Sequence, residues 1–432
     1  PAIGRDLDAG LSGLQWTVDA YTVVLASLLM LAGSTGDRLG RKRTFVAGLV
    51  VFTVASLLCS AAPTVEWLVA FRALQAVGGS MLNPVAMSII TNTFTDPRER
   101  AQAVGVWGMV FGISMALGPV VGGTLVSAVD WRAIFLINLP IGVAAIALTL
   151  RFVPESKAPR ARRPDPVGQA LAIVLLALLT FGIIEAPALG WTSPLIVGAL
   201  ATAGAALAGL LVYEPRREEP LVDLRFFRSV PFASAISLSV AAFAAFGGFL
   251  FLNTLYLQQE RGLSPVQAGL ATVPMALMTV IASPLSGRIV GRRGPRLPLV
   301  IAGVFMTAGC ALLTGLDPAS PFALLIAAYV VFGLGFGFVN APITNTAVSG
   351  MPRAQAGVAA ALATTSRQVG QTLGVAVVGA IAGTAVTGAA AWWTLTACGA
   401  AVLVLGLLAT TARASASARR TATALNPEAL VA

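Results

Sequence analysis

The chain has 432 residues, of which 57% are hydrophobic and 11% are charged, whereas soluble domains carry roughly 25% charged residues. A soluble core cannot use so much apolar surface, so this composition excludes a soluble globular protein and predicts a membrane protein with many spans. The net charge of +10 fits Lys and Arg gathered in cytoplasmic loops, and no nucleic-acid partner is expected.

Histidine is absent from the sequence, which excludes catalysis, metal binding and proton relay by imidazole. The three cysteines (Cys59, Cys310 and Cys398) each lie in an apolar run, without the spacing of a disulfide framework or a metal site. The first ten residues lack the apolar segment of a cleavable signal peptide. We therefore expect neither a cofactor nor a metal.

Apolar segments long enough to cross a bilayer, which takes about 20 residues, occur along the whole chain. They predict an all-α integral membrane protein with thirteen spans, at 17–36, 44–62, 66–90, 101–128, 133–153, 166–187, 194–213, 231–257, 265–287, 297–316, 321–347, 357–386 and 391–412.

Lys and Arg concentrate in alternate loops of this map. One side carries the basic clusters that begin at Arg38, Arg98, Arg151, Arg216, Arg288, Arg353 and Arg413. The opposite side carries only Arg5, Arg132 and Arg261. Since cytoplasmic loops retain positive charge, the first side is predicted to be cytoplasmic, with the C-terminus inside and Pro1 outside.

The first expected span begins with the stretch WTVDAY, which places Asp19 near its outer end. A carboxylate at this point is favoured by the dipole of the helix N-terminus, which would be a purely structural role. Alternatively, Asp19 lies at the mouth of a cavity and takes up a proton or a cation, because burial favours the protonated form of a carboxylate.

The loop GSTGDRLGRKR follows this span on the cytoplasmic side. Gly36 and Gly40 permit a tight turn, and Asp37 is an acid among basic residues. The simplest interpretation is a loop whose charge only fixes its side of the membrane. In the alternative, Asp37 pairs with an arginine across a moving interface and latches one conformation.

Arg72 lies within the apolar span 66–90, in the stretch FRALQAVGGSMLNP. A charge inside a span costs about 2.5 to 3.5 kcal/mol on insertion scales and commonly marks an ion or proton pathway. Because Glu66 at the outer end is only about six residues, or roughly 9 Å, away, the guanidinium could instead reach the interface.

The stretch GISMALGPVVGG spaces its small residues as G-x5-G-P-x2-G-G, with Gly112, Gly118, Pro119, Gly122 and Gly123 at the fixed positions. Glycines at such spacing allow helices to pack closely in a membrane. Pro119 adds a local bend because it removes a backbone donor.

Two further charges lie inside expected spans. Glu185 is near the outer end of 166–187 and is either an interfacial acid or a substrate contact. Arg367 is about ten residues into 357–386, which is deep for snorkelling, so we expect either a functional role or a partner inside the protein.

Two motifs are repeated between the halves of the chain. ITNTFTDPRERAQA at residue 90 returns as ITNTAVSGMPRAQA at 343, 253 residues later, and GDRLGRK at 36 returns as GRIVGRR at 287, 251 residues later. Both copies fall on the cytoplasmic side, so the halves are predicted to be parallel repeats. The predicted parts are a half at 1–153, two inserted helices with linkers at 154–230, a second half at 231–412 and a cytoplasmic tail at 413–432.

Parallel six-helix halves are the build of the major facilitator architecture. The motifs resemble those of its fourteen-helix drug/proton antiporter family over nearly the whole chain. WTVDAY is similar to the W-x-x-D-x-Y of that family, DWRAIFLINLPIG at 130–142 to the start of its sixth helix, and the stretch at 112–123 to the antiporter motif of its exporters. The resemblance implies a cytoplasmic gate formed by Asp37, Arg38 and Arg41, a proton-transfer role for Arg72, and a first helix before residue 1.

We therefore expect a proton-coupled antiporter of the cell membrane that exports lipophilic, cationic drugs or antibiotics by alternating access, acting as a monomer. The alternative is an exporter of one metabolite, such as a self-made antibiotic, an amino acid or a siderophore. A membrane-embedded enzyme is disfavoured by the absence of His and of a G-x-S-x-G motif. A channel or receptor is disfavoured by the antiporter motif and the gate loop.

Overall fold

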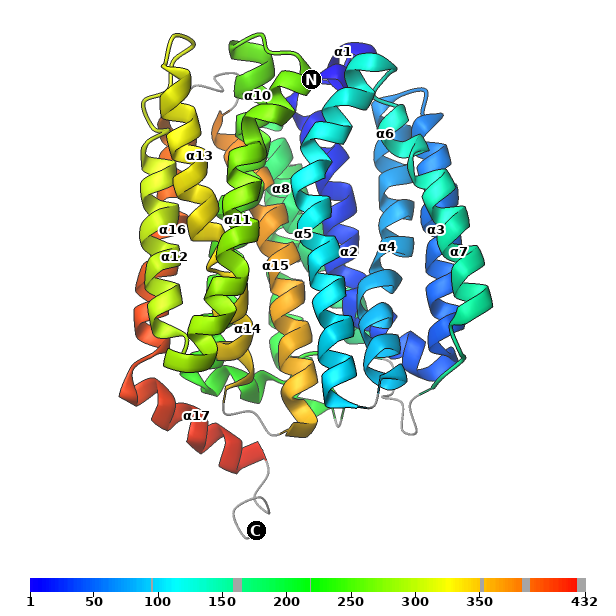
Figure 1. The fold of residues 1–432 in the computed structure, drawn as a ribbon, viewed down its shortest axis with the longest axis vertical. Coiled ribbons are helices and arrows are strands. Elements are labelled where there is room, and N and C mark those ends of the chain that lie inside the picture. Colours follow the sequence, from blue (N-terminus) through cyan, green and yellow to red (C-terminus); the bar gives the residue numbers. More distant parts are fainter. Residues whose placement is uncertain (95, 158–164, 218, 350–352, 383–388, 426–432) are drawn as a thin grey trace. The chain divides into compact units, whose positions relative to one another are not determined.

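The computed structural model describes residues 1–94, 96–157, 165–217, 219–349, 353–382 and 389–425. Within these ranges every regular element is a helix (Figure 1). Ten of the described helices are long and apolar enough to cross a membrane, and shorter apolar helices accompany them. The prediction of an all-α membrane protein is confirmed, whereas the number of spans stays a prediction.

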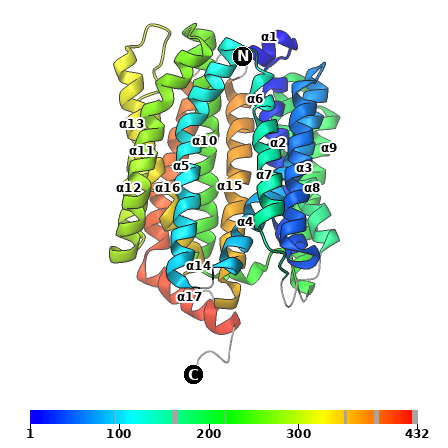
Figure 2. The same ribbon diagram turned by 45° about the vertical axis from the view of Figure 1, so that its right-hand side comes forward.

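The chain divides into two compact units. The N-terminal unit comprises Pro1–Leu221 and Leu263–Leu270. Its elements are α1 (Ala2–Asp6), α2 (Leu11–Leu39), α3 (Arg41–Ser60), α4 (Val65–Thr93), α5 (Pro97–Ala128), α6 (Ala133–Leu136), α7 (Asn138–Phe152), α8 (Pro166–Leu189), α9 (Pro194–Tyr213), η1 (Glu214–Arg216) and the first residues of α11 (Pro265–Arg293). The hairpin of α8 and α9, which corresponds to the two inserted helices, packs through α8 against α2 (Figure 2).

The C-terminal unit comprises Val222–Gly262 and Ala271–Ala432. Its elements are η2 (Leu224–Arg228), α10 (Val230–Leu255), the short π-helical segment η3 (Tyr256–Glu260), the rest of α11, α12 (Arg296–Ala311), α13 (Phe322–Gly337), α14 (Asn340–Val348), α15 (Arg353–Ala382), α16 (Ala389–Ala409) and α17 (Ala412–Leu425). Within this unit α17 lies at an angle to the long helices (Figure 1). The part boundaries expected at 153, 230 and 412 stay predictions.

Two spans expected to be continuous are each broken into two helices. The helix in 133–153 breaks after Leu136, and the helix in 321–347 breaks around Phe338. A proline follows four residues later in both cases, Pro140 and Pro342. Because proline has no N–H, it cannot donate to the carbonyl of Leu136 or of Phe338, which removes one helical bond at each break.

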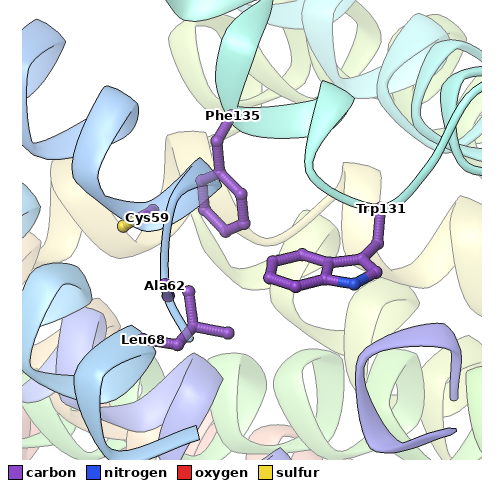
Figure 3. Packing of buried hydrophobic residues seen from close by; sticks show 5 residues of the cluster. All are labelled: Cys59, Ala62, Leu68, Trp131 and Phe135. Carbon is purple, nitrogen blue, oxygen red and sulfur yellow. The ribbon is translucent and has the colours of Figure 1, made fainter. Parts of the chain in front are cut away.

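A hydrophobic cluster closes one end of the N-terminal unit. Cys59, Ala62, Leu68, Trp131 and Phe135 are buried together, and Figure 3 shows them on α3, the turn after it, α4, the turn before α6, and α6 itself. Ile3 and Leu7 from the start of the chain pack on the same cluster.

Candidate functional site

Asp19 on α2 is completely buried, with an exposed fraction of 0%. The Thr22 hydroxyl donates to Asp19 Oδ1 over 3.3 Å, and Asp19 Oδ2 has no hydrogen-bond partner in the described chain. Burying an ionised carboxylate is costly unless it is paired and hydrogen-bonded. With one long hydrogen bond and no ion pair among the described residues, this carboxylate is suited to hold a proton or to accept a positively charged ligand.

Arg72 on α4 is bound to α2 a short distance along the helix from Asp19. Its Nε donates to the main-chain oxygen of Thr17 over 2.9 Å, and its Nη1 donates to Gln75 Oε1 over 2.6 Å. The guanidinium also lies 4.3 Å from the centroid of the Tyr21 ring, which is a cation–π contact. No ion pair joins Arg72 to Asp19 among the described residues, and the bond of Arg72 to the Thr17 oxygen connects it to the same helix as Asp19.

A chain of buried amides and hydroxyls extends from Arg72 across the N-terminal unit. Gln75 Nε2 donates to Ser56 Oγ over 2.7 Å, and Asn138 Nδ2 donates to the same oxygen over 3.4 Å. These bonds connect α4, α3 and α7. Sequence analysis did not single out these three side chains, although Gln75, three residues after Arg72 on one helix, shares its face.

The predicted gate loop forms the junction of α2 and α3. Asp37 accepts from Arg41, with 2.8 Å between Oδ1 and Nη2, so this pair lies within the loop itself, and a pair across a moving interface stays a prediction. The Gly40 N–H donates to the Gly36 carbonyl over 3.1 Å, and Gly40 has φ +119°, a conformation that favours glycine. Arg38 is exposed and forms no ion pair in the described part of the chain.

Glu155, which follows α7, holds this loop and was missed by sequence analysis. Its carboxylate accepts the backbone N–H groups of Lys42 over 3.1 Å and of Arg43 over 3.2 Å at the N-terminus of α3. A carboxylate at this end of a helix satisfies free donors and interacts favourably with the helix dipole. A Cβ on Gly40 would lie 2.7 Å from Glu155 Oε1 and would displace this carboxylate, in addition to the strain of a side chain at φ +119°.

The glycine-rich stretch of α5 packs against the first residues of α11 within the N-terminal unit. A Cβ on Gly123 would lie 2.4 Å from the Pro265 oxygen, and a Cβ on Gly269 would lie 2.3 Å from the Pro119 oxygen. The two helices therefore approach with main chain against main chain, which only residues without a side chain permit.

The other glycines of this stretch have different surroundings. A Cβ on Gly118 or on Gly122 would meet no atom within 4 Å. Gly112 lies within α5, and its surroundings fall outside the described residues. Close packing thus explains Gly123 and leaves Gly118 and Gly122 without a packing role inside the described chain.

The start of the chain is clamped by the stretch that leads into α6. Asp6 Oδ2 accepts from Trp131 Nε1 over 2.9 Å and from Arg132 Nη1 over 2.7 Å, and Arg132 Nη1 also lies 3.2 Å from Asp130 Oδ2. The hydrogen bond from Trp131, followed by that from Arg132, lowers the pKa of Asp6 below its ordinary value.

Glu185 on α8 joins the inserted hairpin to α2. Its Oε1 accepts from Ser12 Oγ over 2.6 Å and from Trp16 Nε1 over 2.7 Å. Further along the same helix, Gln169 Nε2 donates to the main-chain oxygen of Ser27. The sequence left Glu185 as either an interfacial acid or a substrate contact. These bonds show a further, structural role, which is to hold α8 against α2.

Arg367 on α15 is half-buried in the C-terminal unit. Its Nη2 donates to Thr344 Oγ1 over 2.6 Å, its Cζ lies 5.8 Å from the centroid of the Phe243 ring, and its Nε has no hydrogen-bond partner in the described chain. The internal partner that the sequence allowed for is therefore a hydroxyl and an aromatic face, with no carboxylate among the described residues.

Comparison with known proteins identifies the family of this chain. The sequence model described as Major Facilitator Superfamily matches residues 1–375. The tetracenomycin C resistance and export protein of Streptomyces glaucescens is 38% identical over 88% of this chain and 71% of its own length. The multidrug resistance protein Stp of Mycobacterium tuberculosis is 35% identical, with the same coverage of both chains, and the methylenomycin A resistance protein of Streptomyces coelicolor is 35% identical over 88% of this chain and 80% of its own.

Solved structures share the fold. A peptide transporter POT in complex with sulfate aligns with a TM-score of 0.69 at 16% identity, over 96% of this chain and 88% of its own. The human organic anion transporter MFSD10 aligns with a TM-score of 0.61 at 18% identity, over 92% of this chain and 83% of its own. At such identities the likeness concerns the arrangement of helices and carries no information about the substrate.

Proposed function

Because the chain belongs to the Major Facilitator Superfamily, whose members are membrane transporters and not enzymes, we propose that it is a proton-coupled exporter of lipophilic, cationic drugs or antibiotics. Relatives named for resistance to, or export of, tetracenomycin C, methylenomycin A and multiple drugs support drugs and antibiotics as substrates, while the cationic charge is inferred from Asp19. The observation that carries the proton coupling is the buried, unpaired carboxylate of Asp19.

Exchange follows from competition for this carboxylate. A buried carboxylate without a counter-ion is stabilised either by a proton or by a cationic ligand, and the two neutralise the same charge. Protonation of Asp19 from outside would release a bound cation, and loss of the proton towards the cytoplasm would restore the binding state. Arg72, bonded to Thr17 O, fixes the α2 backbone two residues before Asp19 and keeps this carboxylate in place.

The orientation in the cell membrane follows from the distribution of Lys and Arg. We place the loop between α2 and α3, and the C-terminus, on the cytoplasmic side. The Asp37–Arg41 pair keeps the loop ordered there, while the exposed Arg38 is free to pair with a carboxylate that approaches during closure. The exporter is proposed to work as a monomer that rocks about a site near the middle of the bilayer.

Everted membrane vesicles test the proposal. A pH gradient is imposed, and uptake of ethidium is compared with uptake of a neutral hydrophobic compound for wild type, Asp19→Asn and Asp8→Asn. Asp8 is exposed, so it controls for the same chemical change outside the proposed pathway. We expect Asp19→Asn to lower gradient-driven ethidium uptake by about tenfold or more, the effect of losing one charged contact, and Asp8→Asn to leave it unchanged.

Two results would contradict the proposal in different ways. If Asp19→Asn transports ethidium like the wild type, Asp19 is not the coupling group. If ethidium is ignored whatever the gradient, broad export of cations is wrong, and a search for a single exported metabolite should follow.

A further inference from the structure

Arg367 is a positive charge that pairs with no described carboxylate of its own unit. The acids of the C-terminal unit are Asp223, Glu260, Asp317 and Glu428, of which Glu428 lies outside the described residues. Asp223 is bound to Arg225 in η2, and the Asp317 carboxylate accepts from the Ala319 N–H and the Ser320 hydroxyl. No described carboxylate of this unit forms an ion pair with Arg367, and none belongs to α14 or α15.

The donors of Arg367 are only partly used. The Thr344 hydroxyl that accepts from Nη2 in turn donates to the Asn340 carbonyl over 3.1 Å, so its own proton is already committed. The Nε–H of Arg367 is buried and has no acceptor in the described chain. Buried donors are rarely left without an acceptor because the loss of solvation is costly, so this N–H is a donor that a bound ligand can use.

An aromatic ladder, consisting of Phe243, Phe246, Phe336, Phe332 and Phe249, runs to this guanidinium from the core of the unit. Phe249 and Phe332 stack in parallel at 4.5 Å and are fully buried, so one end of the ladder is rigid. Phe246 stacks on Phe336 with 4.1 Å between ring centroids and 7° between planes, and Phe243 meets Phe336 edge to face at 5.3 Å.

The accessible end of the ladder is the end that lies beside Arg367. Phe243 and Phe246 are half-buried, whereas the rings further along are enclosed. A half-buried aromatic edge and a guanidinium with a free donor therefore lie next to each other, with α10 supplying the rings and α15 the charge.

We propose that Arg367, Phe243 and Phe246 form a subsite for an aromatic acid, meaning a planar ring system that carries an ionised carboxylate or phenolate. A planar guanidinium can bind both oxygens of a carboxylate, which the ammonium group of a lysine cannot do as well. An aromatic ring of the ligand can pack on Phe243 or Phe246 in an offset-stacked or edge-to-face arrangement. A cationic ligand is disfavoured at this position by the charge of Arg367. The inference rests on the proposed function in that it adds a second class of exported compound to the cations assigned to Asp19.

Equilibrium dialysis of the purified whole chain in lipid nanodiscs tests the subsite with a matched pair of probes. These are 2-naphthoate and its methyl ester, which share one ring system and differ in charge, with ethidium as the cationic probe. The variants are Arg367→Gln, Arg367→Lys and Phe243→Leu. Trp393→Leu is the control, because Trp393 is an aromatic residue of α16 that is 58% exposed.

We expect the wild type to bind naphthoate more tightly than its ester. Arg367→Gln should weaken naphthoate binding by about tenfold or more, the effect of one lost charge-assisted contact, and leave the ester and ethidium unchanged. Arg367→Lys should keep part of the preference for the acid because it keeps the charge without the planar fork. Phe243→Leu should weaken the acid and the ester alike, and Trp393→Leu should change neither.

A merely structural role for Arg367 would give a different pattern. Arg367→Gln would then weaken all three probes together, or the wild type would not distinguish the acid from its ester, and either result would overturn the inference. The test is separate from that of the proposed function. Absence of gradient-driven ethidium transport by the wild type in vesicles refutes the cation exporter, while selective loss of naphthoate binding in Arg367→Gln would still establish the subsite.

Discussion

Replacing Gly374 on α15 with alanine tests how tightly α15 packs against α10. A Cβ at this position would lie 2.2 Å from the Ala244 oxygen, 2.6 Å from Ala244 Cα and 2.7 Å from its carbonyl carbon. All three atoms belong to the main chain, so no change of rotamer can relieve the overlap. Ordinary contact begins at 3.4 Å, which means that the helices must separate locally by about 1.2 Å, from 2.2 to 3.4 Å.

The free-energy cost follows from this separation. A gap of 0.5 to 1 Å already forfeits about a quarter to a half of the dispersion energy of the contacts it opens. Overpacking of a filled interior costs about 1 to 3 kcal/mol, and we expect a value near the upper end because the obstacle is backbone. Alanine regains about 1 kcal/mol over glycine in helix propensity, which leaves a net destabilisation of about 2 kcal/mol. For a domain of 150 to 250 residues this lowers the unfolding temperature by about 4 to 8 °C.

Thermal unfolding in detergent, followed by tryptophan fluorescence, measures the effect. Gly204→Ala on α9 is the matched control, since a Cβ there would meet no atom within 4 Å and the change of helix propensity is the same. We expect Gly374→Ala to unfold below the wild type and Gly204→Ala at or above it. An unfolding temperature for Gly374→Ala equal to that of the control would refute the argument from backbone contact.

Three further predictions concern the N-terminal unit. Gly123→Ala places a Cβ 2.4 Å from a backbone oxygen of α11 and should lower both expression and stability. Gly118→Ala should preserve both, because a Cβ there meets no atom within 4 Å. Equal thermal stability of the two variants would contradict the close packing of α5 against α11 at Gly123. The pKa of Asp6 is lowered in the folded state, so its ionised form stabilises the fold. The difference in stability between wild type and Asp6→Asn should therefore be constant above about pH 4 and vanish as the pH falls through the lowered pKa. Thermal unfolding from pH 7 to about pH 3 measures this difference. A difference that persists at the lowest pH would show that the Trp131 clamp does not depend on this charge. Glu185→Ala removes two short hydrogen bonds to α2 and should cost about 1.5 to 3 kcal/mol, seen as faster hydrogen exchange in α8; altered transport with unchanged exchange would favour a substrate contact instead.

The part of the site that sequence analysis could locate consists of residues whose chemistry is unusual for their surroundings. Asp19, Arg72 and Arg367 are charged residues inside apolar runs, and any charge in such a run is conspicuous because lipid cannot solvate it. Their partners were not predictable in this way. Thr17 offers only its backbone oxygen to Arg72, and nothing in the sequence marks one carbonyl among many.

Glu155 and Glu185 show the same limit from the other side. Glu185 was recognised as an unusual acid, but its bonds to Ser12 and Trp16 connect residues 173 and 169 positions apart. Glu155 lies in a loop, where acidic residues are common and do not stand out. Its hydrogen bond to the Lys42 N–H at the start of α3 connects residues 113 positions apart. Which loop reaches which helix end depends on how the helices pack, and residue type alone does not encode it.

The sequence by itself determined the helical membrane architecture and the family, because both depend on properties that are local along the chain. Inside a bilayer each backbone donor and acceptor must be satisfied within its own segment, so a long apolar run can only be a helix, and motifs are read as short strings. The tertiary structure alone decided that Arg72 is tied to the α2 backbone, that α8 is held on α2 by Glu185, and that Arg367 lies over the Phe243 ring with no described carboxylate paired to it. Such contacts depend on which helix faces meet and at what depth, and since most faces of a membrane helix are equally apolar, only packing in three dimensions fixes them.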